Sequence, residues 1–117
     1  MSEYELYDIV RGCWNASLKT IEKRNVKYVC ALYHGLIVAV YQPDSWHYGH
    51  EISNLPQKDL SNPKDYERIK NRVYFVCNNY RNLDEEGKFY LYKFIQTGQN
   101  PIMYLSPEQV SNTRELF

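Results

Sequence analysis

The chain has 117 residues, which suffices for one hydrophobic core but not for two, so we expect a single domain over residues 1–117. Its 14 basic and 14 acidic residues cancel, which excludes a global electrostatic attraction to nucleic acid and leaves only local basic patches. Because no apolar run is long enough to span a membrane and the first residues lack signal-peptide features, we expect a soluble cytoplasmic protein without a membrane partner.

Two short helices are predicted at the start of the chain. Apolar residues recur at helical spacing over Glu3–Cys13, and Trp14 follows this helix directly. The second helix runs from Ser17 to about Arg24, with Asn15 or Ser17 as its N-cap.

The strongest strand signal comes from two neighbouring runs, Tyr28–Tyr33 and Leu36–Tyr41. Both are rich in β-branched and aromatic residues, and Gly35 between them supplies the positive φ of a tight hairpin. Since both faces of the second run are apolar, we expect an antiparallel pair at the centre of a sheet. A proline-containing turn over Gln42–Ser45 then ends the strand, which places Trp46 at the end of the sheet.

The second half of the chain gives weaker signals around one clear strand. Ser53–Asp65 is rich in Asn, Pro, Ser and Lys, which predicts a long surface loop that is either mobile or functional. The other predicted elements are helical turns over Tyr66–Asn71 and Leu83–Lys88, strands over Arg72–Asn78 and Ile102–Leu105, an ambiguous segment over Phe89–Ile95 and a terminal helix over Pro107–Leu116. This order indicates an α+β fold: a small, strongly curved, antiparallel-rich sheet or partly closed barrel with flanking helices.

Motifs for catalysis or metal binding are missing from the sequence. No phosphate loop, zinc-protease motif or nucleophile elbow is present. Cys13, Cys30 and Cys77 are widely spaced and odd in number, so we expect no disulfide framework or zinc site, and we expect Cys30 and Cys77 to be buried thiols. His47 and His50 are interpreted as solvated loop residues. We therefore predict no catalytic residue, no metal and no cofactor.

A set of aromatic, basic and amide side chains is the main candidate for a binding site. Aromatic rings stack on nucleobases, while Arg and Asn hydrogen-bond to base edges or to phosphate. Trp14 and Trp46 would supply the stacking surfaces of such a site. The predicted ligand-binding residues are Arg11, Trp14, Trp46, Arg72, Tyr74 and Asn100. In the competing interpretation both tryptophans belong to the core and both arginines to the surface.

Several stretches also carry a resemblance to a known family. They are Tyr7–Trp14, Lys27–Tyr41, Trp46, Arg72–Phe75 and Gly98–Tyr104. Together they resemble a poorly characterised bacterial and phage domain that occurs alone or attached to GIY-YIG nuclease-like modules. The pattern is also reminiscent of PUA-like β-barrels of the ASCH, EVE and YTH group, which bind RNA or modified bases in an aromatic pocket. The histidine-rich continuation after Trp46 departs from the family pattern.

From these observations we expect a non-catalytic binding module that recognises a nucleotide, a modified base or nucleic acid. A phage- or defence-linked protein that sequesters a small signalling nucleotide belongs to the same class. Two alternatives remain open. A nucleic-acid-processing enzyme would use His34, His47 or His50 as a general base. A protein-interaction domain would use exposed residues among the 12 tyrosines to bind a partner chain or to form a homodimer.

Overall fold

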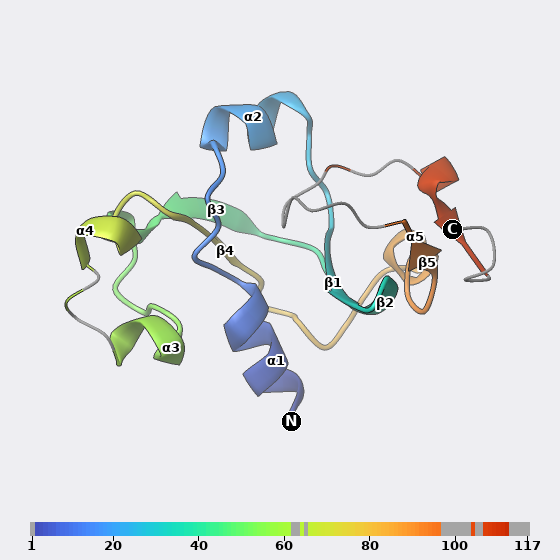
Figure 1. Cartoon of the computed structure of the whole chain (residues 1–117), viewed down its shortest axis with the longest axis horizontal. Coiled ribbons are helices and arrows are strands. Elements are labelled where there is room, and N and C mark those ends of the chain that lie inside the picture. Colours follow the sequence, from blue (N-terminus) through green and yellow to red (C-terminus); the bar gives the residue numbers. More distant parts are fainter. Residues whose placement is uncertain (1, 62–63, 65, 97–103, 105–106, 113–117) are drawn as a thin grey trace. The chain divides into compact units, whose positions relative to one another are not determined.

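The computed structural model describes residues 2–61, 64, 66–96, 104 and 107–112 and has an α+β fold with antiparallel sheets (Figure 1). It divides into two compact units, Met1–Lys27 with Pro43–Arg81 and Tyr28–Gln42 with Asn82–Phe117. The expectation of a single domain stays a prediction. Within the described ranges, every helix is too short or too polar to cross a membrane.

The sheet of the first unit pairs β3 (Ser45–Tyr48) with β4 (Val73–Val76) in antiparallel register. The predicted strand over Arg72–Asn78 is thus confirmed. Trp46 lies opposite Phe75. The placement of Trp46 at the end of the hairpin strand is therefore wrong, because the proline turn leads into a new strand that contains it.

A third segment runs along the other edge of β4. The backbone N–H groups of Trp14 and Val73 each donate to the carbonyl of the other, at 3.0 and 2.9 Å, and Phe75 N–H donates to the Arg11 carbonyl at 2.8 Å. We refer to residues 11–14, β4 and β3 together as the ribbon. Val73, Tyr74 and Phe75 have no exposed surface. The middle of the ribbon is therefore the core of the first unit.

Two N-capped helices precede and follow this segment. α1 (Glu3–Val10) begins at Ser2 in a capping box, and α2 (Leu18–Lys23) begins at Ser17, whose side chain accepts from a backbone N–H as predicted. The predicted extent of the first helix, Glu3–Cys13, is wrong at its C-terminal end. The helix stops early because residues 11–14 direct their backbone groups at β4.

Tyr74 occupies a space that two glycines leave open. A Cβ added at Gly12 would lie 1.8 Å from the Tyr74 ring, and one added at Gly49 would lie 3.1 Å from it. The Tyr74 hydroxyl donates to Asp59 at 3.0 Å. The ring is thus packed closely on the face of the ribbon where these glycines lie.

The remaining helices of the first unit are short. They are η1 (Gly49–Glu51), α3 (Gln57–Leu60) and α4 (Tyr66–Ile69). α4 confirms the helical turn predicted over Tyr66–Asn71. The prediction of a surface loop over Ser53–Asp65 is wrong for Gln57–Leu60, because α3 forms there and is anchored by polar contacts to α1 and to Gly12.

The second unit holds a four-stranded antiparallel sheet. Its strands are β1 (Val29–Tyr33), β2 (Leu36–Tyr41), β5 (Phe94–Ile95) and β6 (Val110–Ser111), in the order β1-β2-β5-β6. The predicted hairpin is confirmed, and its turn residues, His34 and Gly35, have φ values of 50° and 79°. β2 is an inner strand, whereas β1 lies at an edge of the sheet.

The core of the second unit forms around Ile37, Val40 and Ile95. Leu36 and Val38 are only half-buried. Pairing between β1 and β2 shifts register beside Ala31, which disturbs the regular alternation of faces. Ile37 is therefore the deepest residue of the hairpin.

The end of the chain departs from the prediction. α5 (Glu85–Lys88) confirms a helical turn, with Asp84 as its N-cap. In place of the helix predicted over Pro107–Leu116, the described residues form η3 (Pro107–Gln109) and then β6. Backbone pairing of β6 with β5 satisfies groups that a helix would have used. The strand predicted over Ile102–Leu105 lies almost entirely outside the described residues.

The three cysteines are unbridged, as predicted for Cys30 and Cys77. Cys77 is buried, and Cys30 is half-buried against the core of the second unit. Burial raises the pKa of the Cys30 thiol from 9.0 to about 11, because the apolar surroundings disfavour the thiolate.

We expect Ile37→Ala to lower the free energy of unfolding by about 2–5 kcal/mol, because it removes a side chain with no exposed surface and leaves a cavity. Urea denaturation followed by circular dichroism measures this change. Tyr33→Ala is the control: Tyr33 is 66% exposed in the same hairpin and should change stability by about 0.5 kcal/mol or less. Equal effects of the two substitutions would contradict the core assigned here.

The raised pKa of Cys30 predicts slow alkylation of the native protein. Only the thiolate reacts, and a thiol with a pKa near 11 carries about a hundredfold less thiolate at pH 8 than one with a pKa of 9.0. Iodoacetamide labelling mapped by mass spectrometry should therefore show a Cys30 rate that still increases above pH 10. A rate that levels off near pH 9 would show that burial does not protect this thiol.

Candidate functional site

The ribbon brings the two predicted tryptophans onto one face. Trp14 lies opposite Val73, and Trp46 lies opposite Phe75. Residues directly opposite in an antiparallel ladder point to the same side, and alternate residues of a strand share a side. Both indoles therefore project from the face of the ribbon that carries Val73 and Phe75. Asn100, also predicted for the site, lies outside the described residues.

Both tryptophans contact the core and also reach the surface. Each side chain is partly exposed, and the Trp46 ring packs on Phe75 with their centroids 5.4 Å apart. The Nε1 atom of Trp14 is buried and has no hydrogen-bond partner in the described structure. An unpaired buried donor costs about 1–3 kcal/mol. The two interpretations made from the sequence, core and binding surface, are thus not exclusive at these positions.

Arg11 makes a buried ion pair. Its side chain is 5% exposed, and its Nε and one terminal nitrogen lie 3.0 and 2.9 Å from Oδ1 of Asp8. The other carboxylate oxygen accepts from the backbone N–H of Gln57 at 2.9 Å. Because α1 ends at Val10 and not at Cys13 as predicted, Arg11 and Trp14 do not lie one turn apart on a helix. As a ligand contact Arg11 stays a prediction, but its observed partners are structural.

Tyr74, like Arg11, is buried and hydrogen-bonded to another residue of the first unit. Burial, together with hydrogen bonds to Cys13 and Asp59, raises the pKa of its phenol above the ordinary value of 10.0. The hydroxyl therefore stays protonated and donates to Asp59. Because Tyr74 has no exposed surface, it presents nothing to a ligand in this arrangement.

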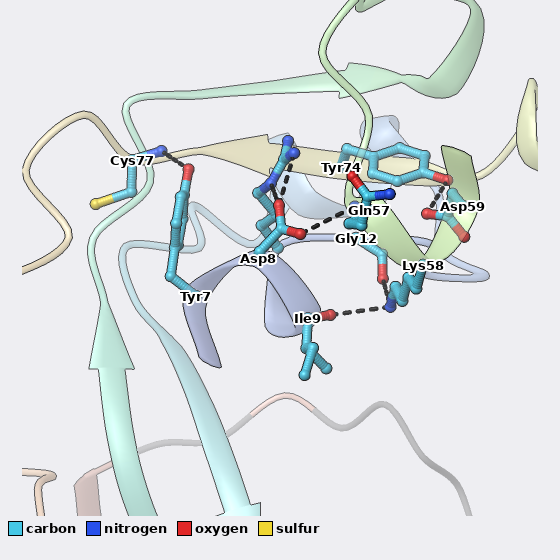
Figure 2. A network of polar contacts seen from close by, with 10 residues as sticks. Tyr7, Asp8, Ile9, Gly12, Gln57, Lys58, Asp59, Tyr74 and Cys77 are labelled. Atoms are coloured by element: carbon cyan, nitrogen blue, oxygen red, sulfur yellow. Dashed lines mark hydrogen bonds and ion pairs between the residues drawn. The ribbon is translucent and has the colours of Figure 1, made fainter. Parts of the chain in front are cut away.

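Three consecutive residues of α3 anchor it to the rest of the first unit (Figure 2). Gln57 N–H donates to Asp8, Lys58 Nζ donates to the carbonyls of Ile9 and Gly12, both at 2.9 Å, and Asp59 accepts from Tyr74. The Lys58 ammonium lies at the C-terminal end of α1, where its positive charge interacts favourably with the negative end of the dipole of that helix. α3 is thus held by polar contacts, although a four-residue helix has little stability of its own.

Basic residues gather beside one end of the ribbon. We call Arg68, Lys70 and Arg72 the basic segment. Arg72 is partly exposed, and its carbonyl accepts from Gly49 N–H at 2.9 Å. A terminal nitrogen of Arg68 lies 3.3 Å from the Cys13 sulfur, which places that guanidinium beside the residue that precedes Trp14.

The structure shows a serine–histidine pair in β3 that was not predicted from the sequence. Ser45 Oγ lies 2.8 Å from His47 Nε2, and both residues are half-buried in β3. One position further along, the rings of Tyr48 and His50 stack with their centroids 5.9 Å apart. The signal that could have found the Ser–His pair is strand alternation, since residues two apart share a face once Ser45–Tyr48 is identified as a strand.

In the described part of the chain, no group of three or more His, Cys, Asp or Glu side chains is arranged to hold a metal ion. Comparison of the chain with family models, with curated proteins and with solved structures finds no match.

We expect Arg11→Ala to lower the free energy of unfolding by about 3–5 kcal/mol, because it leaves the buried Asp8 carboxylate without its cation. Arg81→Ala is the matched control. Arg81 pairs with Glu3 on the surface of the same unit, and its loss should change stability by about 1 kcal/mol or less. Chemical denaturation compares the two variants. An Arg11→Ala protein as stable as the wild type would show that this guanidinium is available to a ligand.

Proposed function

We propose that the chain is a binding module that recognises a nucleotide, a modified base or nucleic acid through the ribbon of the first unit. The observation that carries this proposal is that two partly exposed tryptophans share one face of the ribbon, while the basic segment lies at its end. Stacking surfaces combined with Arg and Lys suit a ligand that has both a base and a phosphate.

Each residue has a distinct role in the proposed complex. Trp46 and Trp14 stack on bases, and Arg72 contacts a phosphate.

The charge distribution favours a small contact area. The chain has no net charge, so attraction to phosphate comes from local cations such as Arg72, whereas Lys70 of the basic segment is already paired with Glu67. Affinity should then depend only weakly on salt, because few counterions are released. This fits a nucleotide or a short single strand better than an extended duplex.

The resemblance to the bacterial and phage domain extends the proposal. It adds a PUA-like barrel as the finer fold, and the sequestration of a signalling nucleotide in a phage or defence context as the biological role. The antiparallel sheets of the two units supply the type of strand pairing that such a barrel requires.

A second candidate is a protein-interaction domain, which exposed aromatic residues of the second unit favour. Tyr33 and Tyr92 are 66% and 67% exposed, and both are rings of the kind enriched at protein interfaces. This role would use a partner chain or a second copy of this chain, and it would leave the tryptophans of the first unit uninvolved.

We expect Trp46→Ala to weaken ligand binding roughly tenfold to a hundredfold, since stacking on an aromatic contributes about 1–3 kcal/mol per base. A panel of nucleotides, modified nucleosides and short single-stranded DNA and RNA oligonucleotides identifies the ligand by thermal shift. Fluorescence anisotropy or calorimetry then gives the Kd of each variant.

Tyr33→Ala serves as the control, because it removes an exposed ring from the second unit. It should leave the Kd unchanged. The urea midpoint of each variant shows that it is folded. If no member of the panel binds, or if Trp46→Ala and Tyr33→Ala bind alike, the proposal fails.

A further inference from the structure

We propose that Ser45 and His47 form a nucleophile–base pair that cleaves a phosphoester, an activity beyond binding. Ser45 Oγ and His47 Nε2 are 2.8 Å apart, within the range of about 2.6–3.2 Å that proton transfer between a nucleophile and its base requires. Both side chains are half-buried. Each side chain therefore keeps part of its surface exposed to solvent.

The strand pairing holds this geometry in place. Ser45 lies opposite Val76, and His47 lies opposite Tyr74, so both side chains stand on the same face of β4 as Tyr74. Tyr74 has no exposed surface and is hydrogen-bonded to Asp59. His47 thus lies beside one of the least mobile side chains of the unit, and a preorganised base loses little entropy on reaction.

The reaction can be written with these two side chains and water. His47 Nε2 accepts the proton as Ser45 Oγ attacks phosphorus, a bond forms between Oγ and phosphorus, and the bond to the leaving oxygen breaks. The imidazolium returns the proton to that oxygen. His47 Nε2 then takes a proton from water as the water oxygen attacks the phosphorus of the phosphoserine, the bond between phosphorus and Oγ breaks, and the imidazolium returns the proton to Oγ. The product is phosphate from a monoester or a phosphate monoester from a diester, and both side chains are regenerated.

A nearby cation selects a phosphoester as the substrate. Arg72 directly precedes β4, and its carbonyl accepts from the N–H of Gly49, two residues after His47, so Arg72 is anchored at the end of the strand pair nearest His47. The carboxylate nearest to Ser45 in the sequence is that of Asp44, and it is directed at the backbone N–H of Asn78, from which it accepts a hydrogen bond at 2.6 Å. An anionic phosphoester has a partner here in the guanidinium.

This inference shares Arg72 with the proposed binding function, but the pair itself stands on the face of the ribbon opposite to Trp14 and Trp46, so labelling of Ser45 tests it separately. A fluorophosphonate probe tests it. Ser45 would displace fluoride from phosphorus, and peptide mapping of the native full-length protein should find the adduct on Ser45. Rates of labelling follow from intact mass.

His47→Gln should slow labelling by about a hundredfold or more, the usual effect of removing a general base. Ser45→Ala should abolish it. His50→Gln, which changes an exposed histidine three residues further on, should leave the rate unchanged. Turnover of bis(p-nitrophenyl) phosphate should fall at least tenfold in Arg72→Gln.

The proposal is overturned if the wild-type protein forms no adduct, if the adduct lies on another serine, or if His47→Gln reacts as fast as the wild type. Mapping of the wild-type protein needs no variant, so this result stands even where a substitution unfolds the chain. Equal turnover by Arg72→Gln and the wild type would overturn the assignment of a phosphoester.

Discussion

The carboxylate of Asp8 holds three parts of the first unit together. It accepts the side chain of Arg11, which follows α1, and the backbone of Gln57, which begins α3. The carbonyl of Arg11 in turn accepts from Phe75 in the middle of the ribbon. A carboxylate buried without its cation costs several kcal/mol, so neither member of the ion pair can leave alone. The position of Trp14 on the ribbon follows from this, because the ion pair fixes where the chain leaves α1.

The high tyrosine content also has a structural explanation. Tyrosine fills a core with its ring, but its hydroxyl must then find a partner. Tyr7 accepts the backbone N–H of Cys77 at 2.8 Å, and Tyr74 donates to Asp59 at 3.0 Å. In the second unit, Tyr28 donates to the carboxylate that caps α5, at 2.6 Å. These hydroxyls join segments far apart in the sequence, so several tyrosines that composition alone would assign to a binding surface belong to the fold.

The parts of the fold that were predicted correctly depend on neighbouring residues, and the parts that were missed depend on distant ones. The hairpin was found because the positive φ at Gly35 and the β-branched runs around it are local signals. α3 was missed because its anchor, from Gln57 to Asp8, spans 49 residues. The same reason applies to the candidate site. Trp14 and Trp46 could be named as aromatic candidates, but their common face follows from strand register, which no short stretch of sequence specifies.

Strand alternation gives the ribbon two chemically different faces. The indoles of Trp14 and Trp46 lie on the face of the ribbon that carries Val73 and Phe75. Ser45 and His47 lie on the other face, which carries Tyr74. A register slip of one residue in β3 would exchange these sets, because alternate residues point to opposite sides. The close packing around Gly49, which directly follows β3, opposes such a slip. A slip would bring Tyr48 or His50 to the place of Gly49, where a Cβ would lie 2.2 Å from the Ile69 carbonyl oxygen and 3.1 Å from the Tyr74 ring. Tyr74, the largest fully buried side chain, thereby helps to determine which side chains each face presents to a ligand.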